Sequence, residues 1–443
     1  MSAKDLCMRL LAAVLILAAG PACAGLDIQH WRTSQGARVY FVENHDLPML
    51  DLEVDFPAGS ARDSRELSGL ASLTRHVMVL GAGSYSERDI AERLADVGAV
   101  FSGQFDADRA GFKLRSLSSA HELEQAMAVL RAVLTTPHFE AAVVEREKAR
   151  AIAALREAAT KPEIIGEKAF SAAIYGEHPY ALPEAGEPES VARLTPESMA
   201  AFHQTYYRAR NMSLAIMGDI SRAQAEALAE HLAADLPPGE AAPPIPPVTT
   251  ALPGTQQVIA HPASQSHLFL GQPGMTRHDP DYFPLLVGNY ILGGGGFDSR
   301  LMEEVRQKKG LAYSVYSYFQ PMQAAGPFQI GLQTRRETTR EALRTVQEVL
   351  ARYLREGPDE AELAQAKNNL VGGFPLRLDS NKKILDYLAV IGFYQLPLNW
   401  LETYIPQVEA VTRAGILDAF QRRIRPEALS TVVVGGQLGE GRH

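Results

Sequence analysis

The segment Gly69–Gly83, GLASLTRHVMVLGAG, has the hydrophobic spacing of a short helix and places three polar residues where a metal site could form. Ser72, Arg75 and His76 stand at positions i, i+3 and i+4, where side chains converge on one helical face. Two His and one Glu there would form the H-x-x-E-H motif, whose His residues bind zinc and whose Glu is the general base. We expect Ser68 to cap this helix. Its buried side would contain Leu70, Leu73, Val77 and Leu80.

The residues present do not suit a zinc site. A catalytic zinc ion needs three protein ligands and one open position, and His76 supplies one ligand. Arg75 would place a fixed positive charge beside the metal, and its guanidinium cannot act as a base near neutral pH. No H-E-x-x-H motif occurs elsewhere in the chain. The sequence therefore predicts a helix without bound metal, in which His76 has a structural role.

A second candidate site lies in the segment Asn289–Tyr316. The four consecutive glycines at 293–296 are not followed by Gly-Lys-Ser/Thr, so the pattern does not predict a phosphate-binding loop. Arg306 and Tyr313 follow, and a guanidinium and a phenol can bind a peptide carbonyl or the oxyanion formed from it. Spacing alone favours a different interpretation, in which Arg306 is a surface helix charge and Tyr313 a half-buried strand residue.

The elements that must position these residues divide the chain into two similar halves. Six prolines between Leu236 and Val248 indicate an extended connector. The segments Val191–Gly218 and Val408–Gly435 match at one constant offset, and each predicts a Thr-capped helix followed by a strand ending at Gly. Hydrophobic patterns predict further strands at 37–42, 50–56, 258–260 and 267–271, and helices at 87–97, 140–160 and 282–292. Strands in early and late runs with helices between them indicate α+β domains.

Composition and the N-terminal residues bound the class of protein. The 443-residue chain is 46% hydrophobic and 21% charged with a net charge of −9, which is typical of a globular protein and not of a nucleic-acid binder. Residues 1–24 have the charged, apolar and small-residue regions of a secretory signal peptide, with cleavage expected near Ala24. Both cysteines, Cys7 and Cys23, lie in this segment; a lipoprotein attached through Cys23 is the alternative. No later segment is apolar enough to predict a membrane span, so we expect a periplasmic or secreted protein.

These motifs together resemble the pitrilysin/insulinase-type metallopeptidases, especially the short two-domain form related to mitochondrial processing peptidase. In that family the first segment reads Gly-Leu-Ala-His-Phe-Leu-Glu-His-Met, so Ser72 replaces the first His and Arg75 replaces the Glu. The family's third zinc ligand is a Glu in a later helix that resembles 145–156, and the expected Glu-Glu pair falls on Ala153 and Ala154. The resemblance thus implies that every zinc ligand except His76 is lost.

The second segment resembles the family's second-domain signature, with Leu-Gly-Gly-Gly, Ser-Arg-Leu and Gly-Leu-Ala-Tyr-Ser. In active relatives an Arg and a Tyr at the positions of Arg306 and Tyr313 reach the zinc site and hold the substrate. The resemblance implies two homologous α/β-roll domains, each a mixed sheet with helices packed on one side. The expected boundaries are a signal peptide at 1–24, a domain at 25–235, a linker at 236–250 and a domain at 251–443.

The resemblance also implies a function. In the short form of the family, two chains often pair around a chamber, one with zinc and the other with the Arg/Tyr pair. This chain fits the second role: a non-catalytic subunit with no catalytic residue of its own, which binds an extended peptide beside a homologous partner that carries the zinc. Two alternatives remain. The chain is a catalytically inert binding or structural protein on the same fold, or it is an active metallopeptidase with an unrecognised site.

Overall fold

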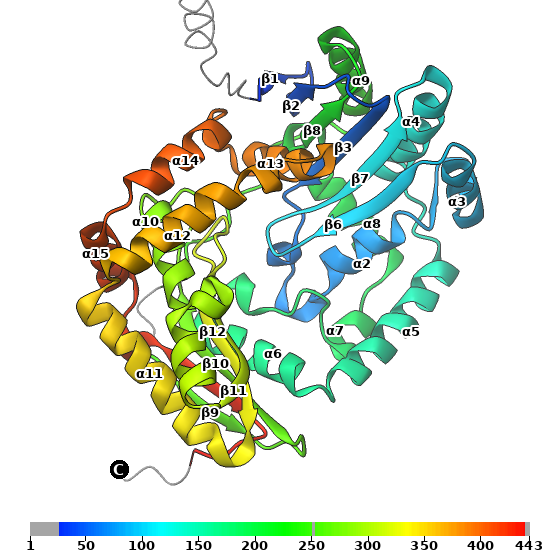
Figure 1. The fold of residues 1–443 in the computed structure, drawn as a ribbon. Helices are drawn as coiled ribbons and strands as arrows, with labels where there is room; N and C mark the ends of the chain where they lie inside the picture. Colours follow the sequence, from blue (N-terminus) through cyan, green and yellow to red (C-terminus); the bar gives the residue numbers. More distant parts are fainter. Residues whose placement is uncertain (1–25, 250–252, 439–443) are drawn as a thin grey trace, which may run out of the picture.

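The computed structural model describes residues 26–249 and 253–438, and the expected signal peptide with both cysteines lies outside the described residues. Two mixed β-sheets, one on each side of the proline-rich segment in the sequence, form the framework of the molecule (Figure 1). No helix in the described ranges is both long and apolar enough to cross a membrane. The mixed α/β class predicted from the sequence is confirmed.

Strands and helices follow the hydrophobic patterns of the sequence. The first half contains the strands β1 (Gln29–Arg32), β2 (Arg38–Glu43), β3 (Met49–Phe56), β4 (Gly81–Ala82), β5 (Tyr85–Ser86), β6 (Val100–Phe105), β7 (Ala110–Leu117) and β8 (Ser213–Gly218). Its helices are α2 (Leu70–Val77), α3 (Glu87–Asp96), α4 (Ala120–Thr135), α5 (Ala141–Ala158), α6 (Pro162–Tyr175), α7 (Pro188–Ala192), α8 (Pro196–Tyr206) and α9 (Arg222–Ala234).

The second half repeats this series with fewer strands. Its strands are β9 (Gln256–Ile259), β10 (Gln265–Pro273), β11 (Ala312–Phe319), β12 (Pro327–Arg335) and β13 (Ser430–Val434). Its α-helices are α10 (Tyr282–Asn289), α11 (Thr339–Glu356), α12 (Glu360–Gly373), α13 (Asn381–Tyr394), α14 (Trp400–Ala410) and α15 (Arg413–Arg423). The helix expected at 282–292 is α10, which continues as a π-helix over Tyr290–Gly294.

The two halves share one topology. The strand order β2-β8-β3-β7-β6 in the first sheet corresponds to β9-β13-β10-β12-β11 in the second, and β1 is an additional edge strand of the first sheet. In each sheet one pair is parallel, β2 with β8 and β13 with β9. Thr195 and Thr412 cap the corresponding helices α8 and α15 through their side-chain oxygens, as the repeat predicted. The shared order and the matching caps favour an internal duplication.

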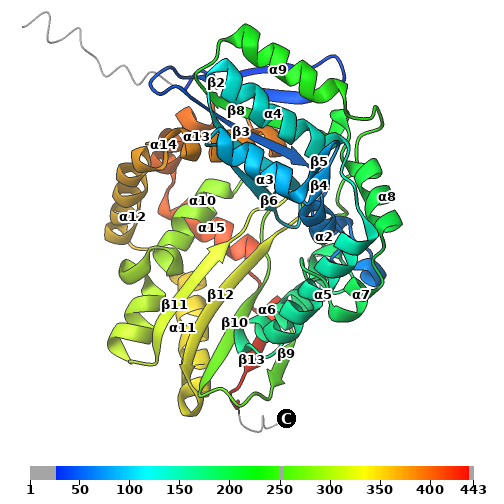
Figure 2. The same ribbon diagram turned by 90° about the vertical axis from the view of Figure 1, so that its right-hand side faces the viewer.

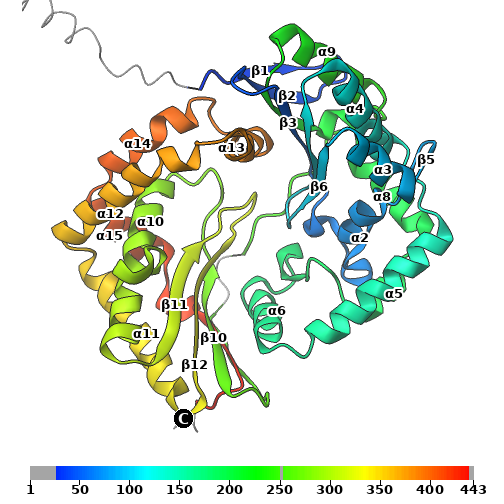
Figure 3. The ribbon, with the colours of Figure 1, turned by 45° about the vertical axis from the view of Figure 1, so that its right-hand side comes forward.

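One helix from each half packs on the β-sheet of the other half. The helix α6, from the first half, packs on β10 and β13, whereas α13, from the second half, packs on β2, β3 and β8 (Figures 2 and 3). A Cβ at Gly392 of α13 would lie 2.6 Å from the ring of Tyr40, so the absence of a side chain lets the helix and the first sheet approach closely. The exchanged helices cover the sheet faces opposite the other helices, and they join the two halves.

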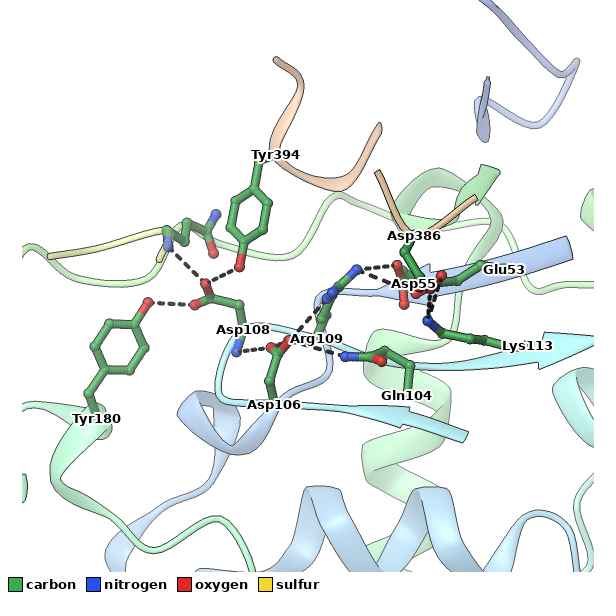
Figure 4. A network of polar contacts seen from close by, with 11 residues as sticks. Glu53, Asp55, Gln104, Asp106, Asp108, Arg109, Lys113, Tyr180, Asp386 and Tyr394 are labelled. Atoms are coloured by element: carbon green, nitrogen blue, oxygen red, sulfur yellow. Dashed lines mark hydrogen bonds and ion pairs between the residues drawn. The ribbon is translucent and has the colours of Figure 1, made fainter. Parts of the chain in front are cut away.

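A buried polar network strengthens this junction (Figure 4). The carboxylate of Asp108 accepts hydrogen bonds from the hydroxyl of Tyr180 in the first half and from the hydroxyl of Tyr394 and the backbone N–H of Gln323 in the second half. The Tyr394 and Gln323 bonds both measure 2.8 Å. Lys113 bridges the same boundary, with its Nζ 2.6 Å from Asp386. One carboxylate thus holds groups from both halves in fixed positions.

The proline-rich segment is attached to the first half along much of its length. Between 237 and 249 it forms neither helix nor strand. The Pro238 carbonyl accepts a hydrogen bond from Arg208, and the Ala242 N–H donates one to the side chain of Asn211. His178 donates a hydrogen bond from Nε2 to the carbonyl of Pro246 over 2.8 Å. The connector is therefore packed against the protein surface in this structure.

Candidate functional site

The helix α2 forms where the first motif predicted it, but its N-terminus is held differently. Gly69 is the N-cap residue with φ of 94°, and the Asp63 carboxylate accepts hydrogen bonds from the N–H groups of Gly69 and Ala71 at 2.7 and 2.9 Å. The expectation that Ser68 caps the helix is wrong, because its hydroxyl donates to the Pro183 carbonyl instead. Burial raises the pKa of Asp63 to about 7. Leu70, Leu73 and Val77 are buried as predicted, whereas Leu80 lies beyond the helix and is half-buried.

The three polar residues of α2 have separate surroundings. Ser72 and Arg75 are half-buried, and His76 is exposed. The Arg75 guanidinium lies over Gly103 of β6, in the space that a side chain at that position would fill. Arg75 forms no ion pair with a described residue, its Nε atom is buried without a partner, and burial lowers its pKa. Arg75 therefore places an unneutralised positive charge on the helix where the family motif has a Glu.

His76 is part of an ion cluster that links α2 to α5. Its Nε2 atom lies 3.1 Å from the Glu147 carboxylate, which also accepts hydrogen bonds from Arg146 at 2.6 Å and Arg150 at 2.8 Å. Glu147 is 4% exposed. Burial alone would raise its pKa, but the Arg146 and His76 hydrogen bonds hold the pKa below its usual value. This network gives His76 a structural role; motif comparison missed Glu147, which lies 71 residues away in the chain.

The later helix α5 brings one carboxylate, that of Glu147, to His76, and these two side chains are one short of the three ligands that a catalytic zinc ion needs. Ala153 and Ala154 lie on α5 and are exposed, one to two helical turns beyond Glu147. Ser72, Arg75 and two alanines cannot complete the coordination that His76 would begin. Nowhere among residues 26–249 and 253–438 do three or more His, Cys, Asp or Glu side chains gather in a way that could hold a metal ion. The residues at the motif positions do not fit zinc.

The structure brings Arg306 and Tyr313 together. Arg306 lies on the π-helix Met302–Lys308, and Tyr313 lies at the start of β11, the edge strand of the second sheet. The guanidinium carbon of Arg306 is 4.6 Å from the centroid of the Tyr313 ring. Tyr313 is 81% exposed, so it is not the half-buried strand residue of the alternative interpretation. A register shift in β11 between Ala312 and Val315 leaves Tyr313 outside the regular pairing with β12.

A third residue completes this arrangement. Phe297 follows the four glycines, is 63% exposed, and its ring centroid lies 4.8 Å from the Arg306 guanidinium carbon. Gln307 donates a hydrogen bond to the Phe297 carbonyl over 3.0 Å and fixes the loop. Two aromatic rings thus contact one guanidinium at the side of a cavity of about 670 Å³. The family motif identifies Arg306 and Tyr313. The only sequence signal for Phe297 is an aromatic residue directly after a run of glycines.

The geometry of this cluster suits recognition of a carbonyl or carboxylate. Aromatic rings stabilise a guanidinium through their faces, which leaves the N–H groups at its edge free to donate. Arg306 forms no ion pair within the described ranges, so those donors have no competing carboxylate. The Tyr313 hydroxyl adds a donor that can rotate toward the same ligand. The cluster can therefore hold and polarise a peptide group.

Both halves of the chain, including the two motif segments, match models of one protein family. Residues 38–187 match the family model described as insulinase (peptidase family M16), and residues 193–370 match the model described as peptidase M16 inactive domain. A crystal structure described as a peptidase M16 inactive domain from Pseudomonas fluorescens is 38% identical, covers 94% of this chain and 99% of its own, and superposes with a TM-score of 0.90. The chain belongs to the peptidase M16 family.

Other M16 relatives differ in how they are described. A protein of Helicobacter pylori described as a non-peptidase homolog is 24% identical over 400 residues, covering 90% of this chain and 92% of the relative. An uncharacterized zinc protease of Bacillus subtilis is 25% identical over 361 residues, covering 80% and 85%. The crystal structure of a protease from Helicobacter pylori shares the fold, with a TM-score of 0.85 at 17% identity over 93% and 99% of the two chains. With Ser72 and Arg75 in place of zinc-site residues, this chain is an M16 homologue of the inactive type.

Proposed function

We propose that this protein is the non-catalytic, substrate-binding subunit of an exported zinc-dependent endopeptidase. It binds an extended peptide through Arg306 and Tyr313 and pairs with a homologous subunit that carries zinc. The chain contributes no catalytic residue and no cofactor; the zinc belongs to the partner. The complex acts in the periplasm or outside the cell after the signal peptide is removed near Ala24.

One contrast carries this proposal. The α2 and α5 motif positions have lost every zinc-binding side chain except His76, whereas Arg306, Tyr313 and Phe297 form a cluster with free donors. Exposed aromatic side chains and unneutralised guanidinium groups are typical of binding surfaces and give the isolated chain little stability. Loss of one site with retention of the other suits a subunit whose chemistry is supplied elsewhere.

The first test is purification of the tagged mature chain from a periplasmic extract of its own host. Mass spectrometry should identify a stoichiometric M16 partner with an intact H-x-x-E-H motif. The isolated chain should contain no stoichiometric zinc by elemental analysis and should not cleave peptides. The complex should contain zinc and should cleave them. Zinc-dependent cleavage by the isolated chain would overturn the proposal in favour of an active metallopeptidase.

The second test separates substrate binding from a purely structural role. Arg306→Ala combined with Tyr313→Phe should lower peptide cleavage by the assembled complex at least tenfold without changing subunit pairing. Arg344→Ala, which removes an exposed charge of α11 paired with Glu348, is the matched control and should have no effect. Unchanged cleavage in the double variant would favour the alternative, a catalytically inert binding or structural protein, for which the non-peptidase relative is the precedent.

A further inference from the structure

A second, larger cavity lies between the two halves beside the exchanged helix α6. Its volume is about 840 Å³, within the range of pockets that enclose drug-sized ligands. Residues of α5, α6 and the loop at 180–188 line it from the first half, and β9 and the β11–β12 hairpin line it from the second. Most of the lining side chains are small or apolar, including Ala158, Ile164, Ile165, Phe170, Ile174 and Met322. Ile164 is 39% exposed, so part of this apolar lining faces solvent.

The larger cavity and the Arg306 cavity lie next to each other along β11. Tyr318 lines both cavities, and Tyr316 lines the Arg306 cavity two residues earlier on the same strand. The rings of Tyr316 and Tyr318 lie 6.1 Å apart with an interplanar angle of 14°. Residues two apart on a strand project to the same face, so the two rings form a continuous aromatic wall between the cavities. A ligand held at Arg306 can extend along this wall to α6.

The distance along β11 suits a short extended peptide. Tyr318 is five positions after Tyr313, which at about 3.3 Å per position is roughly 17 Å of strand. An extended peptide of about five residues could therefore contact Arg306 at one end and enter the larger cavity at the other.

The charged groups at the cavity favour an apolar occupant. Lys168 is neutralised by an ion pair with Glu187, so it offers little to an anionic ligand. The remaining carboxyl groups, Glu167 and Glu184, would repel an anion, and burial raises the pKa of both. Apolar side chains gain free energy in proportion to the area they bury, and this lining can cover them.

We propose that the cavity beside α6 is a subsite for apolar side chains of the peptide that Arg306 and Tyr313 hold. The inference rests on the proposed function and adds the substrate class: peptides with bulky apolar residues about five positions from the residue bound at Arg306. Arg306 binds the peptide backbone, which any sequence provides. The apolar cavity selects among sequences.

The test uses two fluorescein-labelled Gly/Ser peptides of ten residues, one of which carries Leu-Leu-Phe at its centre. Fluorescence anisotropy with the mature full-length chain should show at least tenfold tighter binding of the apolar peptide. Ala158→Trp, which places a large ring in the cavity, should remove this preference. Ala149→Trp, at an exposed position outside the cavity lining on the same helix, is the matched control and should retain it. Equal binding of the two peptides by the wild-type chain would overturn the inference.

A second variant tests whether a loss of preference comes from misfolding, and a crosslink tests where the peptide binds. Ile164→Asp changes a partly exposed lining residue, so it should keep the fold and lower the apolar preference at least fivefold. Benzoylphenylalanine in place of the central Phe should crosslink to α6 or Tyr318; a crosslink elsewhere would overturn the assignment. Arg306→Ala should weaken both peptides equally. If Arg306→Ala weakens both peptides but the wild-type chain shows no preference for the apolar peptide, the subsite alone is contradicted. If Arg306→Ala changes the binding of neither peptide, the proposed function is contradicted.

Discussion

Arg306 contacts the rings of both Phe297 and Tyr313, with its guanidinium carbon 4.8 and 4.6 Å from the two ring centroids. Both rings are largely exposed, so their contacts with Arg306 are not a by-product of core packing. A guanidinium held in this way loses little conformational freedom when it binds a ligand. The resemblance to the family signature identifies Arg306 and Tyr313, and the structure adds Phe297, which orients the cation.

Phe297→Ala should weaken binding of the Gly/Ser peptides about two- to fivefold, because an exposed cation–π contact contributes about 0.5–1 kcal/mol. Phe297→Tyr should bind as the wild type does. Leu376→Ala removes another exposed apolar side chain outside the cavity lining and should have no effect. Anisotropy titrations measure all three variants, and an unchanged dissociation constant for Phe297→Ala would show that Phe297 does not position Arg306.

Glu147→Ala should lower the free energy of unfolding by about 2 kcal/mol, because a buried carboxylate that accepts hydrogen bonds from the charged guanidinium groups of Arg146 and Arg150 contributes about 1.5–3 kcal/mol. Glu157→Ala on the same helix removes a 75% exposed carboxylate paired with the exposed Lys161 and should change stability by less than about 0.5 kcal/mol. Urea denaturation of both variants makes the comparison. Equal effects would mean that the His76–Glu147 cluster does not support the fold.

The comparison of these residues shows what the sequence could predict. Helical spacing, fixed over a few residues, singles out Ser72, Arg75 and His76. Arg306 and Tyr313 follow only from the resemblance of their segment to the family signature. Glu147 and Phe297 act through contacts set by tertiary packing, and no local period marks them. The sequence also does not predict that α6 and α13 pack on the sheets of the opposite halves, because an apolar helix face does not identify the sheet that it covers. Asp63 rather than Ser68 holds the α2 N-terminus because the backbone at 63–69 turns back toward the helix.

Gly392→Ala should destabilise the protein by about 1–3 kcal/mol, because the added methyl group would collide with the Tyr40 ring across the exchanged-helix contact. Gly372→Ala in α12 is the matched control: nothing lies within 4 Å of the added carbon, so the higher helix propensity of Ala should stabilise by up to about 1 kcal/mol. Thermal unfolding should show shifts of opposite sign. A stabilising effect at both positions would contradict the close packing of α13 on the first sheet.

Tyr394→Phe should lower stability by about 1.5–3 kcal/mol, because it removes one of three hydrogen bonds to the buried Asp108 carboxylate. Tyr313→Phe removes an exposed hydroxyl and should change stability by less than about 0.5 kcal/mol. Calorimetry of Tyr394→Phe should still show one transition, because α6 and α13 continue to join the halves. Two separate transitions would show that the halves are coupled by the Tyr394 hydrogen bond and not by the exchanged helices.

His203 should make the folded state less stable in mild acid. It is 5% exposed, donates from Nε2 to the Leu134 carbonyl over 2.9 Å, and stacks on Tyr207. Burial lowers its pKa, so below the ordinary His value of about 6.5 the unfolded chain binds a proton that the folded chain does not. Stability from this group is therefore complete above that value and is lost as the pH falls.

His203→Gln isolates this contribution, because Gln can donate to the same carbonyl and does not titrate. Denaturation midpoints measured between pH 7.5 and 5 should fall less steeply for the variant than for the wild type. Groups with raised pKa values, such as Asp63, give the opposite slope but are common to both proteins, so they cancel in the difference. Parallel curves for the two proteins would mean that His203 is protonated to the same extent in the folded and unfolded chains.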